Sequence, residues 1–372
     1  MPTGINMYVL SNTLRRGNNN FDLMRLLASL MVMLGHSYGM QAGGFESMLM
    51  LTHLESFASL AVYAFFLVSG MLVSASFAAR PSVLRFAAAR AARIWPGVIV
   101  CSAVIAFIIG PIFTSLPVLQ YLSAPAVYRW FASNASLLGN VGGPLPGLFA
   151  DHHAKFLVNS PAWTLPVELK CYVLVLLAGS AGLLASRRGV LAFFIVASSM
   201  FAYFIARPLH IGFLQDFFVL QMGYSFYPVP FFLLGMLLYG FRENVVLSGR
   251  LALVLLFGAA VLRYSWPGTI FFYLCFAYGL LWFCSAKILF RLRPKHDYSY
   301  GIYLYGFVIQ QVFSGFQPNM GSYLSLVFTV PITVVVAAIS WHWVERPALL
   351  LVRRKNGGVT AKSPAQRKSR VS

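Results

Sequence analysis

Long apolar runs, separated by short polar or basic segments, occupy most of the chain. A helix needs about 20 predominantly apolar residues to cross the hydrocarbon core of a bilayer, and runs of that length predict ten membrane-spanning helices. The predicted spans are residues 21–40, 57–77, 94–114, 163–184, 190–206, 224–241, 250–264, 268–286, 298–316 and 322–344. The fifth and the seventh are short. The pattern therefore predicts an all-α fold, a polytopic membrane helix bundle.

Composition supports a membrane protein. Apolar residues make up 59% of the 372 positions and charged residues only 10%, whereas a soluble domain carries roughly a quarter charged residues. Lipid tolerates such a surface when the backbone is hydrogen-bonded within helices. The net charge of +19 could suggest nucleic acid, but the basic residues lie between apolar runs. We expect them to orient the spans, and we predict no nucleic-acid partner.

The distribution of Lys and Arg predicts the orientation. With a cytoplasmic N-terminus, inner segments contain 21 of these residues and outer loops contain 4. Cytoplasmic loops of membrane proteins carry such an excess, so we expect both chain ends in the cytoplasm.

Three divisions follow from these spans. Residues 1–20 are predicted to be a cytoplasmic N-terminal segment, 21–352 a membrane-embedded domain, and 353–372 a basic, disordered cytoplasmic tail. The longest connection, 115–162, falls on the outer side. Loops of this length are often functional or partly helical.

The first span carries a polar stripe. Arg25 and His36 are eleven residues apart, which places them on one helix face with a rise of roughly 16 Å between them. Asp22 and Ser29 share that face. Because ionisable groups facing lipid are costly, the stripe should point into the bundle. The alternative is that Arg25 snorkels to the surface and His36 is an interfacial residue.

A basic cluster precedes the third predicted span. Arg90 and Arg93 are spaced i, i+3 and face together, with Arg85 nearby. The functional interpretation is a site for phosphate, which the planar guanidinium binds well. The alternative is an ordinary positively charged flank on the cytoplasmic side.

The fourth span begins with a carboxylate. In PAWTLPVELKCY, Glu168 is predicted about one turn inside the outer face, where an ionisable residue is rare without a function. Pairing with Lys170 or helix capping would be structural explanations. His36 reaches a similar depth, and the two side chains could form a general base with its orienting partner.

The sequence gives only weak evidence for a metal site or a reactive cysteine. The residues Asp151, His152 and His153 could suggest a metal, but a solvated polar loop is the simpler interpretation, and we predict no metal site. The four cysteines lie in apolar runs without CxxC spacing, so we expect packing residues. An acyl-carrying Cys171 is a weak alternative.

In combination, these strings resemble the acyltransferase-3 family of membrane-bound acyltransferases. The strings are FDLMRLLAS with the following His, FFLVSGMLV, RAARIWP, WTLPVELKCY, SYGIYLY and WHWVERP, and they occur in order along most of the chain. Each is weak alone, but the ordered set is specific. One departure is Gly306, because many members have His after the SYxxYLx string.

The resemblance implies a function. It implies transfer of an acyl group, in our interpretation acetyl, from acyl-CoA to a hydroxyl of a surface or lipid-linked carbohydrate at the inner membrane. It implies that His36 is the catalytic base and that Glu168 lies in the active site. It also implies that Arg25, Arg90 and Arg93 hold the CoA phosphates. Acyl-CoA would be a substrate, and no permanently bound cofactor is expected.

Two other classes stay open at this point. A transporter or flippase of a glycan or lipid-linked precursor would suit the composition, although transporters often show internal repeats and we find no convincing repeat. A non-catalytic subunit of an envelope assembly is the third possibility.

Overall fold

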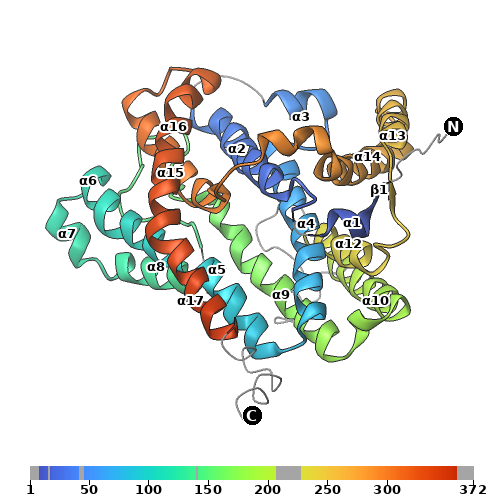
Figure 1. Cartoon of the computed structure of the whole chain (residues 1–372). Coiled ribbons are helices and arrows are strands. Elements are labelled where there is room, and N and C mark those ends of the chain that lie inside the picture. Colours follow the sequence, from blue (N-terminus) through green and yellow to red (C-terminus); the bar gives the residue numbers. More distant parts are fainter. Residues whose placement is uncertain (1–7, 16, 42–45, 140, 207–227, 358–372) are drawn as a thin grey trace, which may run out of the picture.

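Helices from distant parts of the chain pack side by side in the computed structural model, which describes residues 8–15, 17–41, 46–139, 141–206 and 228–357 (Figure 1). Ten helices overlap the ten predicted spans, with limits that differ in places. They are α2 (Phe21–Met40), α4 (Phe57–Ala79), α5 (Val83–Val104), α9 (Thr164–Ser180), α10 (Arg187–Ala206), α12 (Val229–Gly240), α13 (Gly249–Val261), α14 (Trp266–Ser285), α15 (Ser299–Phe316) and α16 (Ser322–Ser340).

Shorter elements connect or extend these helices. The α-helical ones are α1 (Leu10–Thr13), α3 (Ser47–Thr52), α6 (Gly110–Phe113), α7 (Val118–Ser123), α8 (Pro125–Ser136) and α17 (Arg346–Gly357). The 3-10 turns are η2 (Ser160–Trp163), η3 (Leu183–Ala185) and η4 (Lys287–Leu292), and the π-helical turns are η1 (Ile105–Ile109) and η5 (Trp341–Glu345). Strands β1 (Tyr8–Val9) and β2 (Val246–Leu247) form one antiparallel pair.

Six helical stretches of the described chain are long and apolar enough to cross a membrane. They are Phe57–Ala79, Val83–Phe113, Ser160–Ser180, Arg187–Ala206, Trp266–Ser285 and Ser322–Arg354. The helices α12 and α13 are apolar but shorter. These helices identify a multi-pass membrane protein, while the count of ten spans and the orientation stay predictions.

The third span differs from its predicted limits. Helix α5 begins at Val83 rather than near residue 94, so Arg90 and Arg93 lie within the helix and not before it. The helix extends before the predicted limit of the span because charge marks a break in hydropathy, while Ala and Arg remain strong helix formers. The two side chains therefore have helical positions.

The last span is also longer than predicted. Helix α16 continues through the π-turn η5 into α17, so the chain stays helical past residue 344 and to Gly357. Helix therefore extends a few residues into the predicted tail from residue 353. Most of that tail, from residue 358, lies outside the described residues.

Close backbone contact joins α4 to α12. A Cβ at Gly70 would lie 2.2 Å from the Phe232 carbonyl oxygen, and one at Gly235 would lie 2.2 Å from the Leu67 carbonyl oxygen. Small residues at helix crossings in membrane proteins permit this approach. Helix α4 also packs against α2 and α9, which places it at the centre of the bundle.

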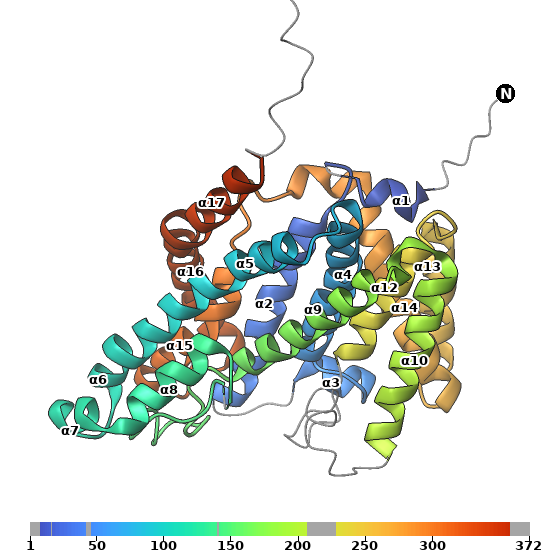
Figure 2. The same ribbon diagram turned by 90° about the horizontal axis from the view of Figure 1, so that it is seen from below.

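The predicted outer connection is folded. Helices α6, α7 and α8 lie together at one end of the molecule (Figure 2), and α8 packs against α5. Within this connection the Asn134 side chain accepts from the Gly142 amide, and the Asn159 side chain donates to the Leu304 carbonyl of α15. The first bond joins two parts of the connection, and the second joins the connection to the bundle.

The N-terminal segment also contacts the bundle. Strand β1 pairs with β2, and the side chain of Leu10 is fully buried. Helices α1 and α17, near the two ends of the described chain, lie at one end of the molecule, opposite α3 and α7 (Figure 2).

Candidate active site

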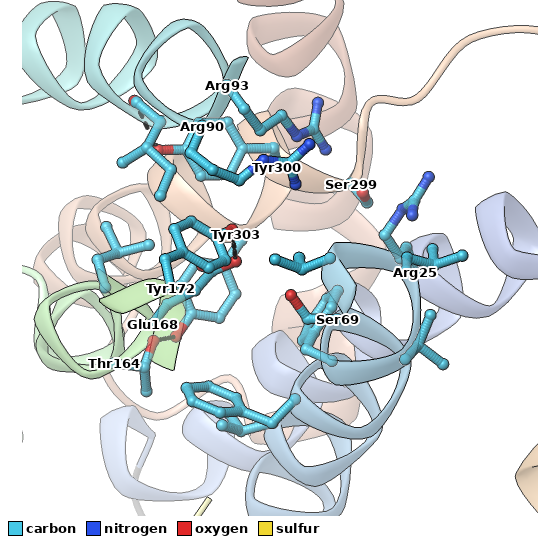
Figure 3. A pocket seen from close by; sticks show the side chains of 18 residues that line it. Arg25, Ser69, Arg90, Arg93, Thr164, Glu168, Tyr172, Ser299, Tyr300 and Tyr303 are labelled. Atoms are coloured by element: carbon cyan, nitrogen blue, oxygen red, sulfur yellow. Dashed lines mark hydrogen bonds between the residues drawn. The ribbon is translucent and has the colours of Figure 1, made fainter. Parts of the chain in front are cut away.

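A cavity of about 140 Å³ lies between α2, α4, α5, α9 and α15. Four of the five predicted site residues line it, namely Arg25, Arg90, Arg93 and Glu168 (Figure 3). Apolar side chains of α4, including Phe65 and Phe66, form another part of its wall.

Two of the arginines share one carboxylate. Nη2 of Arg93 lies 2.8 Å from Oδ2 of Asp297, and Nη2 of Arg25 lies 3.4 Å from the same oxygen. Burial alone would raise the pKa of Asp297, but the guanidinium groups of Arg93 and Arg25 and the Ser299 hydroxyl hold it well below its usual range. Arg25 also pairs with Asp22, one turn earlier on α2, as their predicted common face requires.

Arg93 has a second acidic neighbour. Oε2 of the buried Glu345, on η5, lies 3.9 Å from Nη1 of Arg93, and the Ser340 hydroxyl donates to Oε1 over 3.0 Å. The Arg93 guanidinium also lies 5.3 Å from the centre of the Tyr300 ring. Charges and an aromatic face thus hold this side chain in place.

Arg90 has different surroundings. Its guanidinium carbon lies 5.9 Å from the ring centre of Phe86 and 5.7 Å from that of Tyr172. Among the described residues it has neither an ion-pair nor a hydrogen-bond partner, and its Nε is buried without one. Aromatic faces therefore contact this guanidinium, and the Glu168 carboxylate lies in the same cavity.

Glu168 lies in the same cavity as the arginines. The Tyr172 hydroxyl, one turn further along α9, donates to its carboxylate, and Ser69 of α4 lines the same cavity. Tyr172 therefore contacts Arg90 with its ring and Glu168 with its hydroxyl. Glu168 does not cap α9, whose N-cap is Trp163.

His36 lies outside this cavity. Its ring packs edge-on against Phe307 of α15, with ring centres 5.1 Å apart. No hydrogen bond joins His36 to Glu168 in the described structure, so the predicted pairing is absent here. The reason is that α2 carries His36 about three turns beyond Arg25, along α4 and α15, whereas Glu168 faces the arginines.

Gly306 lies close to a buried side chain of α2. A Cβ at this position would lie 2.8 Å from Cγ of Met33, a fully buried residue of α2 one turn before His36. The Met33 side chain thus lies directly beside Gly306, the position at which many members of the acyltransferase-3 family have His.

Sequence reasoning did not identify several residues of the site. Asp297 and Tyr172 were not singled out, and neither were Thr164 and Tyr303, whose hydroxyls lie 2.5 Å apart in the cavity wall. Tyr172 had a usable signal, because it follows Glu168 by four residues on a helix. Asp297 had only its position before the SYGIYLY string.

The remaining sequence candidates have mainly packing roles. The four cysteines are unpaired, and three of them are buried. In the described residues no three or more His, Cys, Asp or Glu side chains gather as a possible metal site. His152 packs on the ring of Phe149, and its Nδ1 lies 3.5 Å from the Ser314 hydroxyl of α15.

Fold and site together define a class: a multi-pass membrane protein with a charged cavity inside its helix bundle. The family model described as an acyltransferase domain, acyltransferase 3, matches residues 18–342. The chain therefore belongs to this family of acyltransferases, as the six sequence strings indicated.

Two curated relatives resemble nearly the whole chain. An O-acetyl transferase of Shigella phage Sf6 is 27% identical over 332 residues, covering 88% of this chain and 95% of the relative. Nodulation protein 10 of Rhizobium leguminosarum bv. viciae is 28% identical over 357 residues, covering 90% and 94%. No solved structure shows significant similarity.

Proposed function

We propose that the protein transfers an acetyl group from acetyl-CoA to a hydroxyl of a surface or lipid-linked carbohydrate at the inner membrane. The observation that carries this proposal is the cavity in which three arginines and Glu168 meet inside the bundle of an acyltransferase-family protein. The name of the phage relative supports acetyl as the acyl group.

The arginine side of the cavity suits the donor. Coenzyme A carries several phosphate charges, and guanidinium groups bind phosphate through strong, often bidentate, hydrogen bonds. Arg25, Arg90 and Arg93 lie on the side of the cavity that the charge distribution assigns to the cytoplasm, where acyl-CoA is found. The phosphates would bind at this side, with the pantetheine arm extending into the bundle.

The chemistry assigns a role to His36. The acceptor hydroxyl oxygen attacks the thioester carbonyl carbon, so a C–O bond forms and the C–S bond breaks. The hydroxyl proton passes to the imidazole of His36, which returns a proton to the departing CoA sulfur. A hydroxyl needs such a base near neutral pH. The roughly 16 Å of α2 between Arg25 and His36 would be spanned by the extended donor.

Glu168 would act at the acceptor or the donor within the cavity. Its carboxylate accepts a hydrogen bond from Tyr172, which gives it a defined position. We propose that it orients a reacting group, rather than the imidazole of His36, because the ring of His36 contacts Phe307 instead.

The direct test is acetyl transfer by the purified protein. Protein in lipid nanodiscs is given acetyl-CoA with a labelled acetyl group and glycan extracted from a strain that lacks the gene. Appearance of label in the glycan is the expected result, with heat-denatured protein as control. A transporter or a non-catalytic subunit would leave the glycan unlabelled, and that result would contradict the proposal.

A second experiment identifies the acceptor. Envelope glycans from strains with and without the gene are compared by mass spectrometry. A mass difference of one acetyl group, located by fragmentation, would name both the sugar and its hydroxyl.

A further inference from the structure

We infer that Gln310 of α15 is a positioning residue, whose amide oxygen accepts a hydrogen bond from the imidazole of His36 and holds the ring in the tautomer that acts as base. This inference rests on the proposed acetyl transfer. It supplies a group that the proposal lacks, because Glu168 makes no hydrogen bond to His36 in the described structure.

Gln310 is held at the turn of α2 that leads to His36. Its Nε2 atom donates to the carbonyl oxygen of Met33 over 2.9 Å. Met33 precedes His36 by three residues, so the two are neighbours on one helix face. On α15, Phe307 precedes Gln310 by the same interval, and the ring centres of Phe307 and His36 lie 5.1 Å apart. Two contacts between the same pair of faces therefore bring Gln310 beside His36.

Gly306 permits this close approach of α2 and α15. A Cβ at residue 306 would lie 2.8 Å from Cγ of Met33, closer than side chains pack. Because Gly306 has no side chain, Gln310, one turn further along α15, can reach the Met33 carbonyl. The residue that departs from the family string thus makes room for the glutamine contact.

The amide oxygen of Gln310 has no partner of its own. A carbonyl oxygen only accepts hydrogen bonds, so the bond to Met33 turns Nε2 toward it and leaves Oε1 on the other side of the amide. Gln310 is 3% exposed, and Oε1 is buried without a hydrogen bond to any described residue. A buried acceptor left unsatisfied is unfavourable, so this oxygen favours a nearby donor.

His36 requires such an acceptor. Neither ring nitrogen has a hydrogen-bond partner among the residues that the structure describes. An imidazole that takes a proton at one nitrogen carries its hydrogen at the other, and the bond made by that N–H fixes the tautomer. When the ring rotates toward α15, its N–H donates to Oε1 of Gln310. The other nitrogen takes the proton of the acceptor hydroxyl and returns it to the CoA sulfur as the C–S bond breaks.

Other polar groups near this turn are engaged or face elsewhere. The Ser37 hydroxyl donates to the Leu34 carbonyl, and the Ser322 hydroxyl donates to the Ser37 carbonyl over 3.4 Å. Gln41 also has a buried oxygen without a described partner, but five residues of helix place it about 140° around from His36. The glutamine of α15 is therefore the acceptor best placed for the imidazole.

The experiment measures kcat and KM for acetyl transfer by the full-length protein in nanodiscs. Gln310→Met keeps the length of the side chain and removes the amide, so kcat should fall about tenfold, the effect of losing one hydrogen bond in the reacting state. KM for acetyl-CoA should stay at the wild-type value, because Gln310 positions the base and does not bind the donor.

The adjacent glutamine provides the matched control. Gln311 is equally buried, but its Nε2 donates to the carbonyls of Ala154 and Leu157, in the predicted outer connection. Gln311→Met therefore removes hydrogen bonds from the same helix without affecting the turn that carries His36. It should leave kcat near the wild-type value.

A double-mutant cycle separates positioning from packing. In the His36→Ala background, Gln310→Met should lower the residual transfer no further, because the group that it positions is gone. A packing role would lower transfer by the same factor in both backgrounds. Gln310→Asn, one methylene shorter, withdraws the oxygen from His36 and should reproduce the loss of kcat if the methionine variant does not fold.

The outcomes separate this inference from the proposed function. Unchanged kcat in the folded Gln310 variants, an equal loss in Gln311→Met, or an equal further loss in the His36→Ala background would each overturn the inference. In all three cases acetyl transfer by the wild type would stand. If the wild type transferred no acetyl, the proposed function would fail and the inference with it.

Discussion

At the scale of single residues, the environment of each side chain decides which role it can take. Tyr172 shows this, because its ring faces Arg90 and its hydroxyl donates to Glu168. One residue thus links the positive and negative sides of the cavity. His36, by contrast, contacts the ring of Phe307. It can act on the thioester only if the bound donor extends beyond the cavity.

The first prediction concerns His36. His36→Ala should lower acetyl transfer by 10²- to 10⁴-fold, the usual effect of losing a general base. Binding of CoA should stay near the wild-type level, because the arginines are untouched. Transfer and CoA binding are measured on purified protein at matched amounts. Near-wild-type transfer would exclude His36 as the base.

A second residue-scale prediction concerns Glu168. Glu168→Gln keeps the shape of the side chain and removes its charge, so transfer should fall about 10²-fold or more, as when a preorganised electrostatic group is lost. Tyr172→Phe is the matched control, because it removes only the hydroxyl that donates to Glu168. Its effect should be smaller. A larger loss of transfer in Tyr172→Phe than in Glu168→Gln would mean that the tyrosine hydroxyl, and not the carboxylate, acts on the substrate.

At the scale of elements, close helix packing sets the shape of the site. Helix α4 forms one wall of the cavity, and its position depends on the contact of Gly70 with α12. Helix α5 remains continuous through Pro96 and the π-turn η1, so that its arginines belong to the same helix as the residues that pack against α8.

The third prediction tests this packing. Gly235→Ala should destabilise the protein by about 1–3 kcal/mol, because its Cβ would overlap the Leu67 carbonyl and force α12 away from α4. Gly279→Ala is the control, since a Cβ there meets no atom within 4 Å. Alanine should stabilise that helix slightly. Thermal unfolding in detergent is the measurement, and equal midpoints for the two variants would contradict the packing argument.

At the scale of the whole molecule, the two ends of the bundle differ. Helices α1 and α17 lie at one end and α3 and α7 at the other (Figure 2). The excess of Lys and Arg in the predicted inner segments predicts that the first end faces the cytoplasm.

The fourth prediction concerns this orientation. A cysteine at Lys155, which is exposed in the predicted outer connection, should react with a membrane-impermeant maleimide in intact cells. A cysteine at Ser369 should react only after the membrane is permeabilised. The background carries Cys275→Ser, because the other three native cysteines are buried. Labelling of the Ser369 position in intact cells would reverse the orientation.

The sequence by itself determined the membrane character, the helices and the residue types of the site. Hydropathy located the helices because burial in lipid requires apolar length, and it missed their ends at Val83 and Gly357 because helix propensity does not follow hydropathy. Helical period also placed Asp22 with Arg25 and Arg90 with Arg93, since neighbours on one helix face need no tertiary information.

Only the tertiary structure decided which helix faces meet. It placed Glu168 with the arginines rather than with His36, assigned Arg25 and Arg93 to Asp297, and left Arg90 between two aromatic rings. These contacts join residues up to about 270 positions apart, as Asp297 and Arg25 are. They depend on how helices cross, and crossings are set by close contacts such as that of Gly70 and Gly235, which no periodicity within one helix reveals.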